Sequence, residues 1–175
     1  MSRQFEEVVL PHLDAAFNYA RWLTKNDADA QDVVQDACVR ALRFFSSLRD
    51  DDARAWLMTI VRNTWYSRFS RVGGSEPSVA FDEMKHQRSD GNLNAEALML
   101  QRQAIDTVRR AIEELPDDFR EVIVLRELEG LSYREIAAVV GIPMGTVMSR
   151  LARGRERLLV ILGSSATMEG HRDVS

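Results

Sequence analysis

The strongest local concentration of positive charge in this sequence is residues 145–158, GTVMSRLARGRERL, where four arginines fall within eight positions. The chain of 175 residues as a whole carries a net charge of −4 at pH 7. If the segment is a helix turning about 100° per residue, an apolar side faces the core and a polar side faces outward. The inner side holds Val147, Leu151, Gly154 and Leu158, and the outer side holds Gly145, Ser149, Ala152, Arg153 and Glu156, flanked by Met148 and Arg155 and by Arg150 and Arg157.

This outer face suits the major groove of DNA. Small residues permit close approach, Arg153 can reach a base edge, and Arg150 and Arg157 can neutralise phosphates. A solvated, charged helix without a ligand is the alternative interpretation.

The residues just before this segment have the spacing of a helix-turn-helix. In LSYREIAAVVGIPMGTVMSRL, Ser132 and Glu135 predict a capping box at the start of a helix. Ala137 lies four residues before Gly141, and Val147 lies six residues after it. A small residue lets two helices cross closely, a glycine permits the tight turn, and an apolar residue anchors the second helix on the first. The sequence therefore predicts that residues 145–158 form a DNA-reading helix.

The rest of the chain must position this helix. Apolar residues recur three and four apart on both sides of a polar central segment, which favours an all-α fold. Besides the helix-turn-helix, the expected helices cover residues 11–23, 26–45, 53–70, 94–114 and 116–128. Residues 72–93 lack apolar periodicity and predict a flexible linker. The predicted organisation is two small helical domains, 1–71 and 94–162, with a disordered tail over 163–175.

The expected helix over residues 26–45 has an apolar and an acidic side. Asn26 or Asp27 is its predicted cap. The apolar stripe is Ala30, Val34, Ala37, Cys38, Ala41 and Phe45, and the opposite side carries Asp29, Asp32, Asp36 and Arg40. A solvated helix face explains the acidic side as well as a docking surface does.

The expected helix over residues 53–70 interleaves aromatic and basic residues. Trp56 and Trp65 have core spacing, so packing is their default interpretation. Arg62, Tyr66 and the other residues outside that stripe have the composition of a platform on which bases stack while arginines follow phosphates.

Several function classes are disfavoured by the composition. The first residues lack a signal-peptide pattern, and no apolar run approaches the length of a membrane span, so we expect a cytoplasmic chain without membrane insertion. One cysteine and three scattered histidines predict no disulfide and no metal site. Asp50, Asp51 and Asp52 are consecutive and have no histidine beside them, so they are poor candidates for catalysis. We expect neither an enzyme nor a cofactor.

Three quoted motifs carry a family resemblance. DADAQDVVQDACVRAL resembles the polymerase-docking helix of bacterial extracytoplasmic-function (ECF) sigma factors, and AWLMTIVRNTWYSRFSR resembles their promoter-melting helix. ELPDDFREVIVLRELEGLSYREIAAVVGIPMGTVMSRLARGRERL is similar to their region 4 and is the most specific of the three. The resemblance implies regions 2 and 4 only, in a subunit that brings core RNA polymerase to promoter DNA. It also implies an anti-sigma factor that holds the subunit inactive until a stress signal.

The resemblance also implies three sets of site residues. The polymerase-binding set is Asp29, Asp32, Gln35, Asp36 and Arg40. The minus-ten set is Ser47, Leu48, Arg49, Arg62, Asn63 and Tyr66, around a pocket for a flipped base, which must return the lost stacking energy through new contacts. The minus-thirty-five set is Gly145, Thr146, Met148, Ser149, Arg150, Ala152, Arg153 and Arg157.

Two departures and two alternatives remain. Met148 stands where the family usually has Lys or Arg, and Ala152 offers only a methyl group, so we expect a different preferred element or a looser contact. The acidic loop RDDD puts the identity of the minus-ten base in doubt.

A decoy that titrates an anti-sigma factor and a stand-alone helix-turn-helix repressor are the alternative functions. Because the net negative charge weakens nonspecific attraction to phosphates, we expect the isolated protein to bind promoter DNA weakly.

Overall fold

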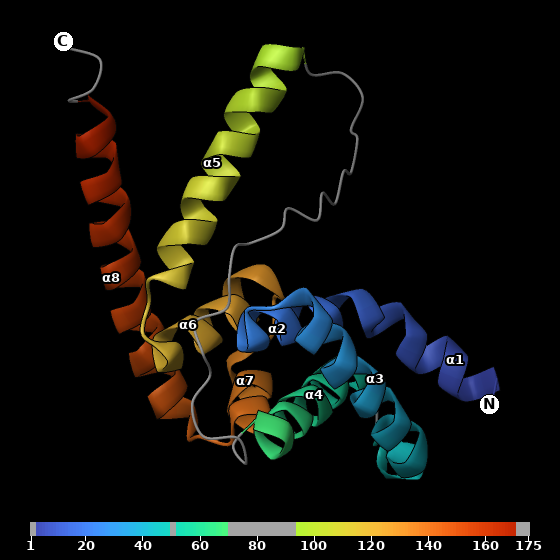
Figure 1. The fold of residues 1–175 in the computed structure, drawn as a ribbon. Helices are drawn as coiled ribbons and strands as arrows, with labels where there is room; N and C mark the ends of the chain where they lie inside the picture. The colour runs from blue at the N-terminus through green and yellow to red at the C-terminus, as the bar shows by residue number, and fades with distance from the viewer. Residues whose placement is uncertain (1–2, 50–51, 70–93, 171–175) are drawn as a thin grey trace. The chain divides into compact units, whose positions relative to one another are not determined.

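The computed structural model describes residues 3–49, 52–69 and 94–170 of the chain (Figure 1). Within these ranges the elements are helices joined by short turns, and none is a strand, so the predicted all-α class is confirmed. The predicted linker lies outside the described residues.

The chain divides into two compact units. One unit contains residues 1–81 and 124–148, and the other contains residues 82–123 and 149–175. Residues 124–148 belong to the first unit because helix α7 (Tyr133–Val140) packs on helix α4 (Ala53–Phe69). This grouping differs from the ranges 1–71 and 94–162 that the sequence suggests.

The first unit begins with two short helices where one was expected. The helix predicted over residues 11–23 is preceded by α1 (Arg3–Val9), and a 3₁₀ turn, η1 (Leu10–His12), joins α1 to α2 (Leu13–Thr24). Pro11 lies inside this turn rather than inside the helix, because a proline fits the first residues of a helical segment, where no N–H donor is needed. Lys25 ends α2 with a left-handed backbone, φ 58°.

Helices α2, α3 (Asp27–Phe44) and α4 pack against one another. Asn26 caps α3, with its side-chain oxygen accepting a hydrogen bond from the Asp29 N–H at 3.1 Å. The buried stripe of α3 is Ala30, Val33, Ala37 and Ala41, so Val33 replaces the expected Val34, while Cys38 is half-buried. Small alanines at these positions let the helix axes approach closely.

On α4 the fully buried side chains differ in part from the expected stripe. Leu57, Met58, Val61 and Thr64 are buried, whereas Trp56 and Trp65 are only half-buried. The two tryptophans are therefore not the centre of this core. Thr64 satisfies its hydroxyl by donating to the Ile60 carbonyl at 2.7 Å.

The second unit contains α5 (Ala95–Glu113), α6 (Asp117–Ile123) and most of α8 (Met144–Gly170). Arg120 of α6 is buried and donates to the carbonyls of Ile112, Glu113 and Leu115 at 3.3, 2.6 and 2.7 Å. It thereby satisfies carbonyl groups that the end of α5 leaves without helical partners.

Helix α6 continues into a π-helical turn, η3 (Val124–Leu128), so the single helix expected over residues 116–128 has two parts. Helix α8 runs to Gly170, so residues 163–170 are helical and not the disordered tail that was expected. In the described part of the chain no single helix is long and apolar enough to cross a membrane; α7 and α8 qualify only together, with a bend of 102° between them.

Candidate nucleic-acid interface

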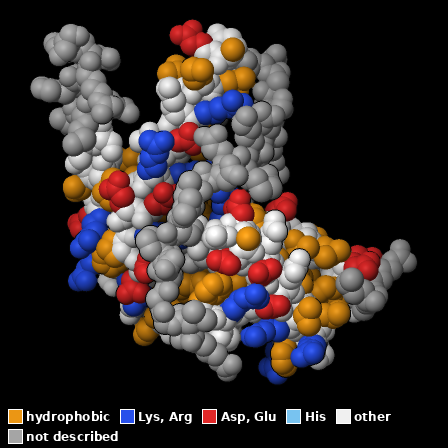
Figure 2. All heavy atoms as spheres, in the orientation of Figure 1, with side chains coloured by type: hydrophobic (Ala, Val, Ile, Leu, Met, Phe, Trp, Pro, Cys, Tyr) orange, Lys and Arg blue, Asp and Glu red, His pale blue; other side chains and the backbone are white. Residues whose placement is uncertain are grey.

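Helix α8 has the two sides that its sequence predicts. Val147, Leu151 and Gly154 are buried on the inner side, and Leu158 is half-buried. The predicted minus-thirty-five residues lie on the remaining surface: Gly145, Met148, Ser149, Ala152, Arg153 and Arg157 are exposed, and Thr146 and Arg150 are half-buried. Basic side chains line the outer edge of this helix in Figure 2.

Two of the arginines are held by α6. Arg150 Nη1 lies 3.8 Å from Asp118 Oδ1, and the guanidinium of Arg157 lies 5.4 Å from the centre of the Phe119 ring. Both contacts join α8 to α6, and Arg153 is exposed. The sequence pattern did not single out Asp118 and Phe119.

A close approach between helices explains Gly154. A β-carbon placed there would lie 2.9 Å from Ile123 Cγ1 and 3.4 Å from Phe119 Cβ. The absence of a side chain at residue 154 therefore lets α8 contact α6 directly, and this contact carries the arginine-rich face.

The helix-turn-helix geometry is present. Ser132 Oγ accepts a hydrogen bond from the Glu135 N–H at 3.1 Å, and the Glu135 carboxylate accepts one from the Ser132 N–H at 2.5 Å. Gly141 ends α7 with φ 73°, a left-handed conformation that favours glycine.

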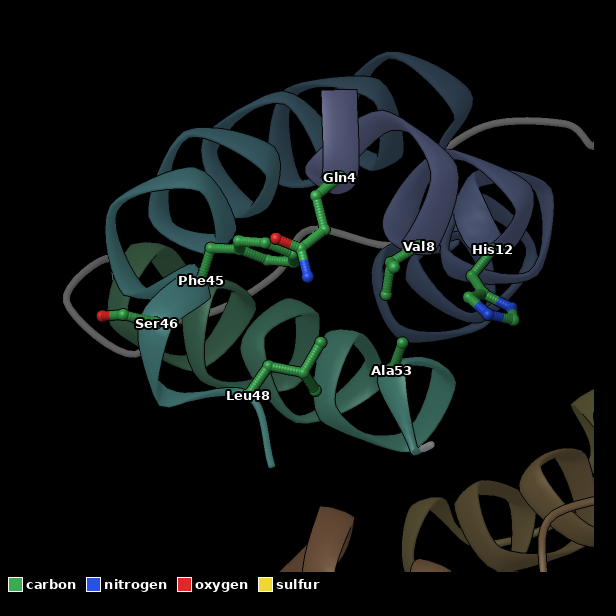
Figure 3. Close-up of a pocket in the computed structure, with 7 residues that line it drawn as sticks. All are labelled: Gln4, Val8, His12, Phe45, Ser46, Leu48 and Ala53. Atoms are coloured by element: carbon green, nitrogen blue, oxygen red, sulfur yellow. The ribbon is translucent and has the colours of Figure 1, made fainter. Parts of the chain in front are cut away.

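The predicted minus-ten loop begins in a 3₁₀ turn, η2 (Phe45–Ser47). Ser47 Oγ donates to the Phe44 carbonyl at 2.7 Å, and Arg49 is exposed. Leu48 lines a hollow of about 610 Å³ whose other walls come from η2, α1, η1 and the start of α4. In the close-up, Gln4 and Val8 extend toward Phe45 and Leu48, while Ser46 points away (Figure 3).

A second group of predicted minus-ten residues lies further along α4. The Arg62 guanidinium lies 4.5 Å from the centre of the Tyr66 ring and donates to the Tyr66 hydroxyl at 3.3 Å. Trp65 meets Tyr66 edge to face, with ring centres 4.6 Å apart. Asn63 is exposed. These side chains give α4 a surface that combines rings with a cation and an amide.

The two groups do not form one pocket. Ala53 lines the hollow, and Asn63 lies ten residues further along α4, about 15 Å away at 1.5 Å per residue. The hollow is instead completed by Gln4, Val8 and His12, which sequence reasoning missed. No local pattern relates these N-terminal residues to the loop, so only the packing of α1 could reveal them.

The predicted polymerase-binding residues all lie on α3. Asp32 and Asp36 have side chains that are 51% and 53% exposed, Gln35 is exposed, and Asp29 and Arg40 are half-buried. Arg68 of α4 bridges the two carboxylates: its Nη1 donates to Asp36 Oδ2 at 2.7 Å and its Nη2 to Asp32 Oδ2 at 3.3 Å. We refer to Asp32 and Asp36 as the acidic pair.

Exposed apolar side chains accompany the acidic pair on α3. Val39, Leu42 and Phe44 are 56%, 44% and 59% exposed. Val39 and Leu42 are three residues apart and share one side of α3, whereas Phe44 lies about 160° around the helix from Leu42. The sequence contains a signal for them, because they fall outside the buried stripe.

A charged cluster joins α4 to residues near the helix-turn-helix. Arg54 Nη2 donates to Glu129 Oε2 at 3.3 Å, and Glu129 is 8% exposed. Burial raises the pKa of Glu129, and Arg54 opposes this shift. The carboxyl groups of Asp52 and Glu135 share a hydrogen bond; burial, with the charge of Glu135, raises the pKa of Asp52. Burial also acts to raise the pKa of Glu135, but the hydrogen bonds with Ser132 and Asp52 and the charge of Arg54 together outweigh it, so the net shift is downward.

Among the residues that the structure describes, no three His, Cys, Asp or Glu side chains are grouped so that they could hold a metal ion. The lone cysteine, Cys38, has a pKa raised by burial, which disfavours its thiolate form.

Two profile matches define the class of protein to which this fold belongs. Residues 8–73 match the family "Sigma-70 region 2", and residues 105–158 match "Sigma-70, region 4". Region 2 thus includes α3 and α4, and region 4 includes the helix-turn-helix and the exposed arginines of α8. The class is that of the sigma-70 factors.

Similarity to two relatives over most of the chain narrows the class. The chain is 44% identical over 137 residues to the ECF RNA polymerase sigma-E factor of Escherichia coli, covering 74% of this chain and 72% of that protein. It is 30% identical over 154 residues to the ECF RNA polymerase sigma factor SigE of Mycolicibacterium smegmatis, covering 88% and 60%. This chain belongs to the ECF family of RNA polymerase sigma factors.

Solved structures have the same fold. The sigma factor RpoE of Bartonella quintana, in complex with the anti-sigma factor NepR, superposes with a TM-score of 0.72 at 30% identity, covering 93% of this chain and 98% of that one. CnrH in complex with the cytosolic domain of CnrY gives a TM-score of 0.63 at 30% identity, covering 93% and 89%.

Proposed function

We propose that this ECF sigma factor directs core RNA polymerase to promoters whose minus-thirty-five element is read by α8 and whose minus-ten element is bound by residues 47–49 and α4. The observation that carries the proposal is the two-sided α8, with a buried apolar side and an exposed arginine-bearing side behind a capped helix-turn-helix. The activity is that of a binding subunit, and the polymerase supplies the chemistry.

On α8, base reading and phosphate contact fall to different residues. Arg153 is exposed and long enough to reach a guanine edge, where a guanidinium donates two hydrogen bonds. Gly145 and Ala152 let the helix approach the bases closely. Arg150 and Arg157, held along the α6 side by Asp118 and Phe119, suit the phosphate backbone. Met148, 52% exposed, offers an apolar contact where a cation would otherwise stand.

In region 2, the loop before α4 and the helix itself would contact different parts of the minus-ten element. The hollow beside Leu48 has space for an extruded base, and Tyr66 with Arg62 offers a ring and a cation for the unpaired strand. Asn63 can donate to and accept from a base edge.

Core polymerase would dock on α3. The acidic pair supplies charge, and Val39, Leu42 and Phe44 supply exposed apolar area beside it. Exposed apolar side chains next to carboxylates can supply both the apolar and the charged contacts of a protein interface.

Free and polymerase-bound forms should differ in their affinity for DNA. In the free chain Arg54, beside the minus-ten loop, is bonded to Glu129, which precedes the helix-turn-helix by a few residues. While this contact is closed, Glu129 neutralises a cation beside the minus-ten loop and so reduces its attraction for DNA phosphates, which supports weak promoter binding by the isolated protein.

An anti-sigma factor is the expected regulator. The two similar solved structures are complexes, one with the anti-sigma factor NepR and one with the cytosolic domain of CnrY. By this likeness, the present chain would be held inactive in the cytoplasm by a protein partner and released by a signal.

The test is run-off transcription with purified core polymerase on a fragment from upstream of the protein's own gene. Wild type should initiate, and Arg153→Ala should reduce initiation by about 5- to 150-fold, because one good bidentate base contact is worth about 1–3 kcal/mol. The matched control is Arg109→Ala, which removes an exposed arginine from α5.

Equal transcription by Arg153→Ala and Arg109→Ala would contradict the proposal that α8 reads the promoter through Arg153. No initiation by wild type on any genomic fragment would favour a decoy that only titrates an anti-sigma factor. Tight, sequence-specific gel shifts by the free protein would favour a stand-alone repressor.

A further inference from the structure

The two carboxylates assigned to polymerase binding already have a cationic partner in the free chain. Arg68 lies in the last turn of α4 and spans Asp32 and Asp36, which are one turn apart on α3. Its Nη1 donates to Asp36 at 2.7 Å and its Nη2 donates to Asp32 at 3.3 Å. This bridge uses the planar fork of arginine, which a lysine cannot reproduce.

Arg68 takes Oδ2 of both carboxylates, so a basic group of polymerase that binds these oxygens must compete with its guanidinium. While the bridge is closed, the acidic pair presents a net charge of about −1 rather than −2, so its attraction for a cationic partner is reduced. Arg68 therefore occupies the positions that a basic group of the polymerase would take on Asp32 and Asp36.

We propose that Arg68 is an internal competitor of RNA polymerase, which occupies the acidic pair in the free chain and must leave it when the polymerase binds. The inference rests on the proposed function, because it requires that the acidic pair contact the polymerase. Arg68 is a regulatory residue: it weakens the initial attraction between the sigma factor and the polymerase. Only a partner with a correctly placed basic group can then displace it.

The exposure of the three side chains makes such exchange feasible. Arg68, Asp32 and Asp36 are 41%, 51% and 53% exposed, so water can solvate each group as the bridge opens. Exposed ion pairs contribute up to about fivefold each to an equilibrium constant, which is small enough for a partner to overcome. If the ion pairs with Arg68 were buried, the two carboxylates could not be reached by the polymerase.

The experiment measures the affinity of full-length chain for purified core polymerase at fixed ionic strength, without DNA. Arg68→Gln should tighten binding by about two- to tenfold, and Arg68→Lys should lie between it and wild type. Asp32→Asn with Asp36→Asn should weaken binding. Adding Arg68→Gln to that double variant should cause no further change, because the competitor then has nothing to occupy. Arg109→Gln on α5 controls for the loss of one positive charge.

The outcomes separate the two ideas. If the double asparagine variant binds polymerase as wild type does, the assignment of the acidic pair to polymerase fails, and the competitor with it. If that variant binds weakly while Arg68→Gln binds no more tightly than Arg109→Gln, only the competitor is overturned. Circular dichroism and thermal unfolding should show all variants folded, since the bridge is exposed.

Discussion

At Gly154 a single atom decides how α8 packs against α6. Alanine has the higher helix propensity, by about 1 kcal/mol. At residue 154, however, a β-carbon would lie 2.9 Å from a buried Ile123 atom, and such overpacking costs about 1–3 kcal/mol. We therefore expect Gly154→Ala to lower the free energy of unfolding by roughly 1 kcal/mol, measured by chemical denaturation.

A matched control lies on the same helix. Gly163 of α8 has nothing within 4 Å of the position of its β-carbon. Gly163→Ala should raise the free energy of unfolding by up to about 1 kcal/mol, because only helix propensity changes. If both alanines stabilise the protein, the close contact between α8 and α6 is not what selects glycine at residue 154.

At the scale of elements, Arg120 joins the end of α5 to α6. Its guanidinium donates to three carbonyls and forms an ion pair with Asp117 at 2.9 Å. Arg120→Met keeps most of the side-chain volume but removes a donor from all three carbonyls; the Ile112 carbonyl keeps the Leu115 N–H at 3.1 Å, whereas those of Glu113 and Leu115 lose the guanidinium. We expect a loss of about 2–4 kcal/mol in the free energy of unfolding, because each buried acceptor left unpaired costs about 1–3 kcal/mol.

Comparison with an exposed arginine makes this prediction specific. Arg109→Met on α5 should change the free energy of unfolding by less than about 0.5 kcal/mol. A cost for Arg120→Met no greater than that of Arg109→Met would show that the turn between α5 and α6 is held by its apolar residues alone.

At the scale of the whole molecule, the contact of α4 with α7 responds to pH. The pKa of Asp52 is raised from 3.8 by burial and by Glu135, and burial raises the pKa of Glu129 from 4.5. A raised pKa means that the folded form holds its proton more tightly, so this stability is complete at low pH and lost as pH rises through the raised values. Glu135, whose pKa is lowered from 4.5, acts oppositely, and its contribution is lost as pH falls.

Asp52→Asn isolates the first contribution. The amide oxygen can still accept the hydrogen bond that Asp52 Oδ1 receives from the Ala55 N–H at 3.3 Å, but it does not repel Glu135. We expect a gain of about half a kcal/mol at pH 7, small because the pair is partly solvated, and no gain near pH 4. The measurement is chemical denaturation between pH 4 and pH 8. A variant that is less stable than wild type at every pH would mean that the carboxylate is needed only as a helix cap.

The local rules of the sequence determined the helices and their faces. The capping box of Ser132 and Glu135, the caps Asn26 and Asn94, and the left-handed Gly141 each depend on residues only a few positions apart. The same periodicity placed the arginines of α8 outside and Val147 and Leu151 inside. Such features are readable because backbone geometry alone brings their members together.

Only the tertiary structure decided which distant side chains meet. Arg68 is 32 residues from Asp36, Arg54 is 75 residues from Glu129, and the hollow beside Leu48 is closed by Gln4 and Val8. No periodicity relates such residues, because their contact depends on how whole helices pack. The sequence therefore determined which surfaces of this sigma factor carry charge, and the packing decided which of those charges are already paired within the chain.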